Sequence, residues 1–239
     1  MTSANVSAER WTKIGSSKTS PLDQTNRKTI GLDRPYVVVG FEVNNPQAYS
    51  NDTQDLAVDY GHAFFYLVKR KIIAIAFSFG PNGAGKVGWL GKYSIGALIK
   101  DGMTNSRPGT PDYEITETVK AFQILLSAEQ AARLTEETKK MREEIMRGSV
   151  RYSAFVNDTC AETAKEILDE AGIETPSGSG SIKHSKHLSF PIVYAVNPYK
   201  WHQNFKKQGH IEKTFKPTAI YAWTPPINEA DPIFSGQAK

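Results

Sequence analysis

Apolar and β-branched residues gather in short runs along the first half of the chain, and turn-forming residues separate these runs. "PYVVVGFEV" (35–43) is one such run, and its β-branched residues predict a strand. "YGHAFFYLVKRKIIAIAFSFGP" (60–81) holds two apolar runs with a short basic stretch between them, which predicts a β-hairpin. The strand pattern resumes in "DYEITETVKAF" (112–122).

Helical spacing dominates the second half of the chain. Ser127 and Gln130 form a capping box, and Gly148 ends the segment that follows. Within it, residues recur at helical spacing on one face: Ala131, Leu134, Thr138, Met141 and Ile145. A second helix is predicted from about Cys160 to Ala171, with Gly172 as its end.

The remaining segments divide into two further strands and several loops. "FPIVYAVNP" (190–198) and "TAIYAW" (218–223) read as strands. Loops are predicted for 44–55, for the glycine-rich stretch 80–109 with at most one short helix, and for "PSGSGSIKHSKH" (176–187). We therefore expect one domain over residues 34–224. The polar residues 1–33 are predicted to be a flexible N-terminal arm and residues 225–239 a C-terminal tail.

Composition narrows the class of protein. At 239 residues and 39% hydrophobic, the chain can build a core without disulfides or metal. Its 29 Lys and Arg exceed its 25 Asp and Glu by only four charges, spread along the chain, so nucleic acid is not an expected partner. A single cysteine excludes an internal disulfide and a cysteine-rich zinc site, and we expect neither a metal nor another cofactor.

No segment has the pattern of a targeting signal or membrane span. The N-terminal residues lack the apolar stretch of a signal peptide, and the longest apolar run, 72–79, is too short to cross a bilayer. We therefore expect a soluble protein without stable membrane insertion.

Cys160 is the first candidate for chemistry. Thr159 can cap the helix with Glu162 three residues on, which places Cys160 at the first helical position. Backbone N–H groups and the helix dipole at that position favour a thiolate. Cys160 also lies on the apolar stripe of the helix, so we expect it at the floor of a cleft or buried. The alternative is a small buried residue without chemistry.

A thiol hydrolase needs a histidine within hydrogen-bond reach of the sulfur. Of the five histidines, His62 differs because it begins an apolar strand, on the same side as Phe64, Tyr66 and Val68. The alternative is a core histidine that a carbonyl group satisfies.

This order of elements resembles the circularly permuted NlpC-type members of the papain-like cysteine peptidase superfamily. The matching pieces are "YGHAFFYL", "LLSAEQAARLTEETKKM" and "YSAFVNDTCAETAKEILDEAGI", and the likeness covers about residues 36–224. It implies an α+β papain-like fold in which an antiparallel sheet packs against helices. It further implies that Cys160 is the nucleophile and His62 the base.

The third polar residue of the family has several candidates in this chain. A two-residue turn at Arg70 and Lys71 puts Ser78 on the face opposite His62, whereas a three-residue loop brings Ser78 to His62. Asp59 is close to His62 in sequence, and Asn157 is a candidate for the oxyanion site together with the Cys160 N–H.

The resemblance implies cleavage of amide bonds in peptidoglycan peptides, as in antibacterial effectors of type VI secretion systems. Such a protein would be cytoplasmic in its producer and active in the target-cell periplasm, with an immunity protein and a secretion-apparatus carrier as partners. Two alternatives stay open: a lipid-directed thiol acyltransferase or phospholipase of the same superfamily, and a non-enzymatic binding module.

Two further motifs are weak. "GPNGAGKV" (80–87) resembles a phosphate-binding loop, but Val87 stands where Ser or Thr would bind magnesium. "HSKH" places His184 and His187 three residues apart, without the helix or acidic partner that a metal site needs. Both are interpreted as loops.

Overall fold

A computed structural model describes residues 34–81, 109–153, 158–185, 192–217 and 229–234. The chain divides into two units, Met1–Arg34 and Pro35–Lys239, and the elements below belong to the second. The predicted arm (1–33), most of the glycine-rich stretch (82–108) and the predicted strand 218–223 lie outside the described residues.

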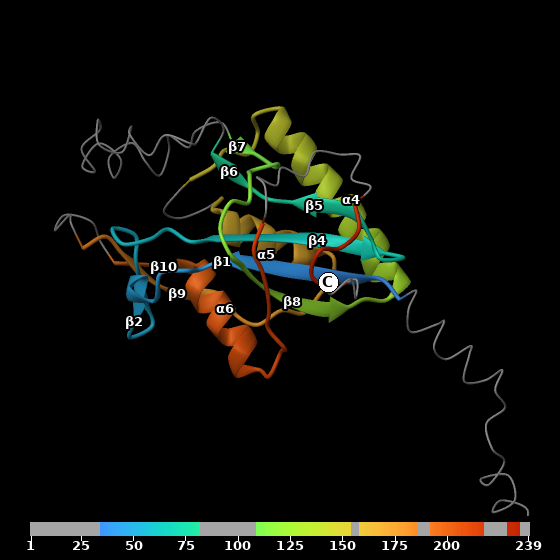
Figure 1. The fold of residues 1–239 in the computed structure, drawn as a ribbon. Helices are drawn as coiled ribbons and strands as arrows, with labels where there is room; N and C mark the ends of the chain where they lie inside the picture. Colours follow the sequence, from blue (N-terminus) through green and yellow to red (C-terminus); the bar gives the residue numbers. More distant parts are fainter. Residues whose placement is uncertain (1–33, 82–108, 154–157, 186–191, 218–228, 235–239) are drawn as a thin grey trace, which may run out of the picture. The chain divides into compact units, whose positions relative to one another are not determined.

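The described part of the second unit has an α+β architecture whose centre is an antiparallel sheet (Figure 1). The strand order is β11-β8-β1-β4-β5. Their bounds are β1 Tyr36–Glu42, β4 His62–Lys69, β5 Ile72–Phe77, β8 Val119–Leu125 and β11 Lys213–Phe215. The predicted strand β1 and the predicted hairpin β4–β5 are confirmed. The strand expected from 112 begins only at Val119.

A smaller sheet has the strand order β10-β9-β3-β2. Its strands are β2 Tyr49–Ser50, β3 Thr53–Asp55, β9 Ser179–Lys183 and β10 Val193–Val196, and the short helix η1 (Pro46–Ala48) precedes β2. The loop predicted for 176–187 is therefore wrong over β9, and the loop predicted for 44–55 is wrong over η1, β2 and β3. Backbone groups form the ladder, so small polar residues can enter it when neighbouring strands offer partners. A separate pair joins β6 (Gly80–Pro81) to β7 (Gly109–Thr110).

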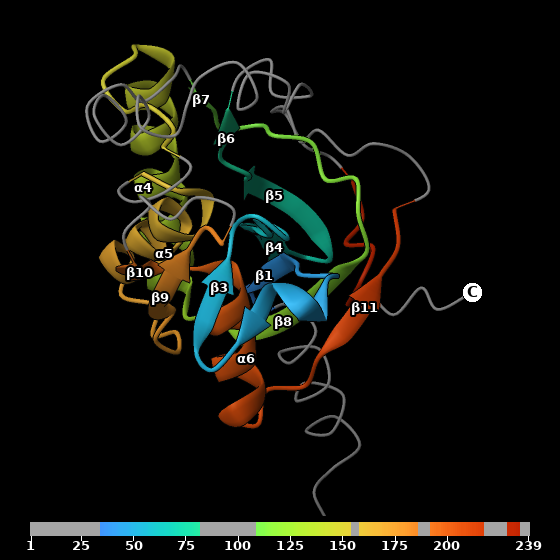
Figure 2. The ribbon, with the colours of Figure 1, turned by 90° about the vertical axis from the view of Figure 1, so that its left-hand side faces the viewer.

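Three α-helices lie in the described ranges: α4 Ala128–Met146, α5 Cys160–Glu170 and α6 Pro198–Lys207 (Figure 2). The capping box of α4 at Ser127 is confirmed. The end of α5 before Gly172 is also confirmed, because this glycine has a φ of +71° that other residues rarely adopt. α6 was not predicted, although Asn197 accepts a hydrogen bond from the Lys200 N–H as its N-cap and Pro198 opens its first turn.

The central sheet is buried on both faces by side chains that alternate along its strands. One face packs against the helices. Its core includes Val37, Val39, Phe65, Leu67, Leu134, Ile167, Trp201 and Phe205. The other face has its own core, which includes Val38, Phe64, Tyr66, Ile73 and Ile115.

Part of the segment predicted as a tail packs on the second face. Ala230 pairs with Ile72, and Ile233 and Phe234 contact the second core. Asp231 is fully buried and accepts hydrogen bonds from the hydroxyls of Tyr36 at 2.6 Å and Tyr66 at 2.7 Å. Residues 229–234 therefore belong to the folded domain, because this carboxylate supplies the acceptors that two buried tyrosines need.

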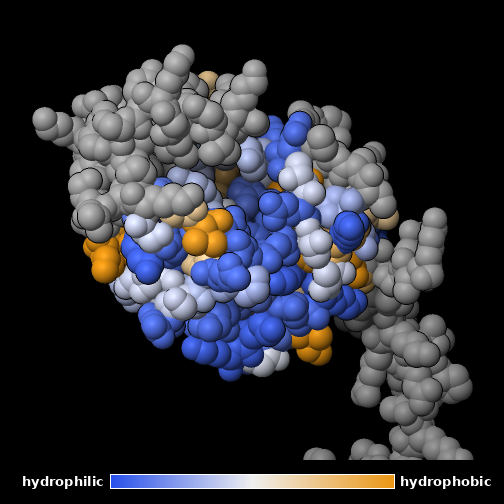
Figure 3. Space-filling model, turned by 60° about the vertical axis from the view of Figure 1, so that its left-hand side comes forward, coloured by the Kyte–Doolittle hydropathy of each residue, from blue (hydrophilic) through white to orange (hydrophobic). Residues whose placement is uncertain are grey.

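The described residues on the face shown in Figure 3 are mostly hydrophilic, and hydrophobic residues are few there. Within the described ranges, none of the helices combines the length and the apolar character needed to cross a membrane.

Candidate active site

The thiol of Cys160 lies where α5 begins. Thr159 is the N-cap of this helix, and its hydroxyl accepts a hydrogen bond from the Glu162 N–H at 3.1 Å. Cys160 therefore occupies the first helical position, as predicted. Its side chain is 4% exposed and belongs to the core between α5 and the sheet, together with Ala164, Ile167 and Leu168.

Burial decides the protonation of this thiol. It raises the pKa of Cys160 to about 11, while hydrogen bonds from the N–H groups of Ala63 and Ala161 and from the Tyr152 side chain lower the pKa by less. The thiolate expected from the helix position is thus wrong for this state of the protein. The helix start does supply N–H groups, but loss of solvent around a fully buried sulfur outweighs them.

His62 opens β4 and pairs with Glu42 of β1. Its side chain is 6% exposed, and its Nε2 lies 2.8 Å from the Ser78 Oγ. Burial lowers the pKa of His62 to about 3, so the imidazole is neutral at pH 7. A neutral imidazole can accept a proton, but a pKa of about 3 makes His62 a weak general base in this state.

A β-bulge brings Ser78 to His62. The hairpin has the two-residue turn at Arg70 and Lys71, both with positive φ, and Lys69 pairs with Ile72. The register then shifts, because Val68 pairs with Ile73 but Leu67 pairs with Ile75, which leaves Ala74 as an extra residue. The expectation that a two-residue turn separates Ser78 from His62 is therefore wrong. It overlooked the bulge, which turns Ser78 to the face of His62.

The side chains of His62 and Cys160 lie on opposite faces of the sheet at the beginning of β4. Ala63, which follows His62, faces the helix-side core that contains Cys160, and its N–H donates to the sulfur. The His62 ring stacks on Phe64 of the opposite face at a centroid distance of 6.0 Å. In this structure the side-chain hydrogen bond of His62 goes to Ser78, and the sulfur is held by two backbone N–H groups and a tyrosine.

Tyr113 borders both groups. Its ring centroid lies 5.1 Å from that of His62, and its N–H donates to the Ser78 carbonyl at 2.7 Å. Burial raises the pKa of Tyr113, and the negative charges of Glu42 and of ionised Cys160 raise it further. Tyr113 therefore contacts the imidazole directly and is influenced by charge at the thiol.

Asp59 has a different environment from the one expected of an orienting residue. Its carboxylate accepts hydrogen bonds from the Tyr199 hydroxyl and, at 3.1 Å, from the Gly61 N–H. It thus shapes the turn before β4, while Ser78 contacts the His62 ring. Asn157 lies outside the described residues, so its oxyanion role stays a prediction.

Three residues of the site were not singled out from the sequence: Glu42, Tyr113 and Tyr152. Glu42 left a signal, since a carboxylate in an apolar strand is seldom buried without partners. It is 5% exposed and accepts hydrogen bonds from the N–H groups of Thr116 and Glu117. Tyr113 and Tyr152 could not be predicted from the sequence, because their positions near the thiol depend on the conformation of the loops that contain them.

Only part of each of the two weak motifs is described. Only Gly80 and Pro81 of the phosphate-loop pattern are described, and they pair with β7. His184 follows β9 and is buried, while His187 lies outside the described residues. Among the residues that the structure describes, no group of three or more His, Cys, Asp or Glu side chains could hold a metal ion.

Comparison of the chain with protein-family models, with curated proteins and with solved structures found no match.

The raised pKa of Cys160 gives a direct prediction for thiol labelling. Because the thiolate is the reactive form, the rate of alkylation by iodoacetamide should keep rising with pH towards about 11 in the folded protein. In urea the midpoint should lie near 9, the ordinary value. At pH 8 we expect labelling to be at least about tenfold slower in the folded state.

Mass spectrometry reads this experiment cleanly, since Cys160 is the sole cysteine. The fully unfolded protein serves as the reference for intrinsic thiol reactivity. A folded-state midpoint at or below 9 would show that the helix start and its N–H groups outweigh burial.

Proposed function

We propose that the chain is a cysteine hydrolase with a papain-like fold of the permuted NlpC type, which cleaves amide bonds in peptidoglycan peptides. One observation carries the proposal: the sulfur of Cys160 contacts the N–H of Ala63, the residue directly after His62. Thiol catalysis also requires the imidazole to reach the sulfur, so the proposal needs the His62 ring, which bonds Ser78 on the other face of β4, to turn towards Cys160 when substrate binds.

The order of proton transfers follows from the two pKa values. With the pKa of Cys160 at about 11 and that of His62 at about 3, both groups are neutral at pH 7. Transfer of the thiol proton to His62 is uphill with these values, so the proposal requires substrate binding to bring the two groups together as the sulfur attacks the amide carbonyl carbon. Because Ser78 engages Nε2, the nitrogen left for this proton is Nδ1.

The remaining steps use the same groups. The tetrahedral oxyanion accepts hydrogen bonds from N–H groups at the start of α5, where the Ala161 N–H now holds the sulfur. His62 gives its proton to the leaving amine, and the C–N bond breaks to leave a thioester. Water then loses a proton to His62 and attacks the thioester, which releases the carboxylic acid and restores the thiol.

The biological setting belongs to the same proposal. An enzyme of this kind made as an antibacterial type VI effector would need an immunity protein in its producer and a carrier on the secretion apparatus. Its substrate would lie in the periplasm of the target cell.

The experiment that tests this function digests purified sacculi with the full chain and with Cys160→Ala, and analyses the released muropeptides. We expect a new amine and a new carboxylate from one type of amide bond, with the wild-type protein only. Phospholipid vesicles form the second arm. Release of fatty acid with intact muropeptides would replace the substrate class with a lipid ester.

One observation favours a second function, that of a non-enzymatic binding module. The thiol is almost completely buried and its pKa is raised, as expected of a cysteine that only fills space. In that case neither substrate is cleaved, and Cys160→Ala binds sacculi as well as the wild-type protein does in a pull-down assay.

A further inference from the structure

A groove of about 450 Å³ lies on another part of the domain, between the end of β1 and the helix α6. This volume is in the range of small-molecule sites in proteins. Its walls combine aromatic and basic side chains: Tyr49, Lys120, Tyr199, His202, Lys206 and Lys207.

The groove has a strongly one-sided charge. Three of its nine lining residues are lysines, and none is acidic. Lys120 comes from β8, and its Nζ donates to the Val43 carbonyl at 2.8 Å. Lys206 and Lys207 come from the last turn of α6, and Lys206 lies 3.7 Å from Glu212. Within the described ranges, neither Lys120 nor Lys207 has a carboxylate in salt-bridge contact, and an acidic influence on Lys207 comes from Asp52.

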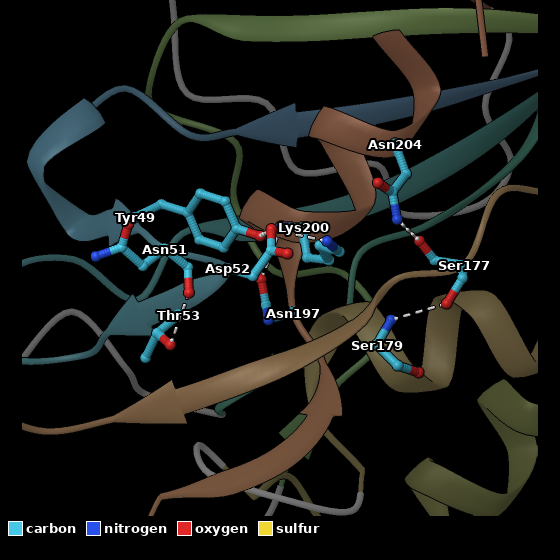
Figure 4. A network of polar contacts seen from close by, with 9 residues as sticks. All are labelled: Tyr49, Asn51, Asp52, Thr53, Ser177, Ser179, Asn197, Lys200 and Asn204. Carbon is cyan, nitrogen blue, oxygen red and sulfur yellow. Dashed lines mark hydrogen bonds and ion pairs between the residues drawn. The ribbon is translucent and has the colours of Figure 1, made fainter. Parts of the chain in front are cut away.

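The wall that contains Tyr49 is held to α6 by a polar network (Figure 4). The Lys200 Nζ lies 2.8 Å from Asp52, whose carboxylate also accepts a hydrogen bond from the Tyr49 hydroxyl at 3.1 Å. Tyr49 and Tyr199 stack at a centroid distance of 6.0 Å. The groove is therefore preformed, which lowers the entropy cost of binding.

Burial is the main influence on the pKa of His202 in the groove wall. Its Nε2 lies 2.6 Å from Glu212, and the hydrogen bond to this carboxylate raises its pKa. Burial lowers the pKa of His202 more, and the charges of Lys120 and Lys206 lower it further. The ring is thus held neutral at pH 7.

We propose that this groove binds a small ligand that carries two or more carboxylate or phosphate groups. The cations come from two different elements, β8 and α6, so one ligand with two anionic groups can use both. The aromatic pair offers apolar contact area for the body of the ligand. This binding site does not depend on the activity of Cys160.

The experiment titrates the full chain at low salt with pyrophosphate and with citrate, and uses acetate as the monoanion control. Calorimetry should show saturable binding of one ligand per chain for pyrophosphate, citrate or both. The bound anion should also raise the pKa of His202 in NMR titrations, because it offsets the lysine charges. Pyrophosphate alone would indicate a phosphorylated ligand, and citrate alone a polycarboxylate.

A pair of matched variants separates the groove from general surface charge. Lys206→Gln/Lys207→Gln should weaken binding at least tenfold. Lys139→Gln/Lys140→Gln removes the same charge from exposed positions of α4 and should leave binding unchanged. Failure of both pyrophosphate and citrate to saturate, equal loss in the two variants, or an unmoved His202 pKa would overturn the proposal.

Discussion

Replacing Cys160 by alanine is expected to lower kcat/KM for peptidoglycan amide hydrolysis by roughly ten-thousand-fold or more, because no other thiol is present to form the thioester. His62→Ala should lose nearly as much, and the double variant should lose little beyond either single one. Nucleophile and base act on the same step, so their contributions do not add. Initial rates of amine release from defined muropeptides measure all three variants.

Folding has to be separated from chemistry in this series. Cys160→Ser keeps the size of the side chain and should unfold at nearly the wild-type temperature while it remains inactive. Ser78→Ala tests orientation of the imidazole, since it removes the hydroxyl 2.8 Å from Nε2 and leaves both reacting groups in place. Full activity in Cys160→Ala or in His62→Ala would contradict the proposed hydrolase.

Asp231→Ala is expected to lower the free energy of unfolding by about 2–6 kcal/mol, at roughly 1–3 kcal/mol for each of two buried tyrosine hydroxyls left without an acceptor. The carboxylate accepts two tyrosine hydroxyls and the N–H groups of Ile233 and Phe234. Burial raises the pKa values of Tyr36 and Tyr66, so both stay protonated as donors. Removing the carboxylate leaves these donors buried without an acceptor. Urea unfolding followed by circular dichroism measures the change.

An exposed aspartate provides the matched control for this measurement. Asp169 is 52% exposed and pairs with Lys165 one turn away on α5. Asp169→Ala should cost less than about 1 kcal/mol, as surface ion pairs do. Asp231→Asn keeps the shape without the charge and should fall between the two. A cost for Asp231→Ala no larger than that for Asp169→Ala would show that the segment 229–234 contributes little to stability.

The sequence predicted elements well where local chemistry and burial point the same way. β1 and the β4–β5 hairpin have β-branched, apolar runs, and α4 has both a capping box and an apolar stripe. β9 was missed because its serines and glycines resemble a loop, and only its neighbours in the sheet give it partners. α6 was missed because the predicted strand 190–198 included Asn197 and Pro198, which are the residues that begin this helix.

The candidate site was predictable only in part for a related reason. The position of Cys160 follows from a cap and a stripe, both of which are local. The pKa of its thiol depends on how deeply the sulfur is buried against the sheet, and the sequence alone does not show this burial. Ser78 depended on a single unpaired residue in the hairpin, and Tyr113 and Tyr152 depended on the paths of loops.

Because of the bulge, β5 contains one residue, Ala74, that has no pairing partner in β4. Removing Ala74 would leave a regular ladder in which Ile73 still faces Val68 and Ile75 still faces Leu67. A gain of one residue has no comparable reserve and would turn every following side chain to the wrong face. Deletion of Ala74 should therefore be tolerated in β5, whereas insertion of a residue should not. After the deletion Ser78 would still lie next to His62.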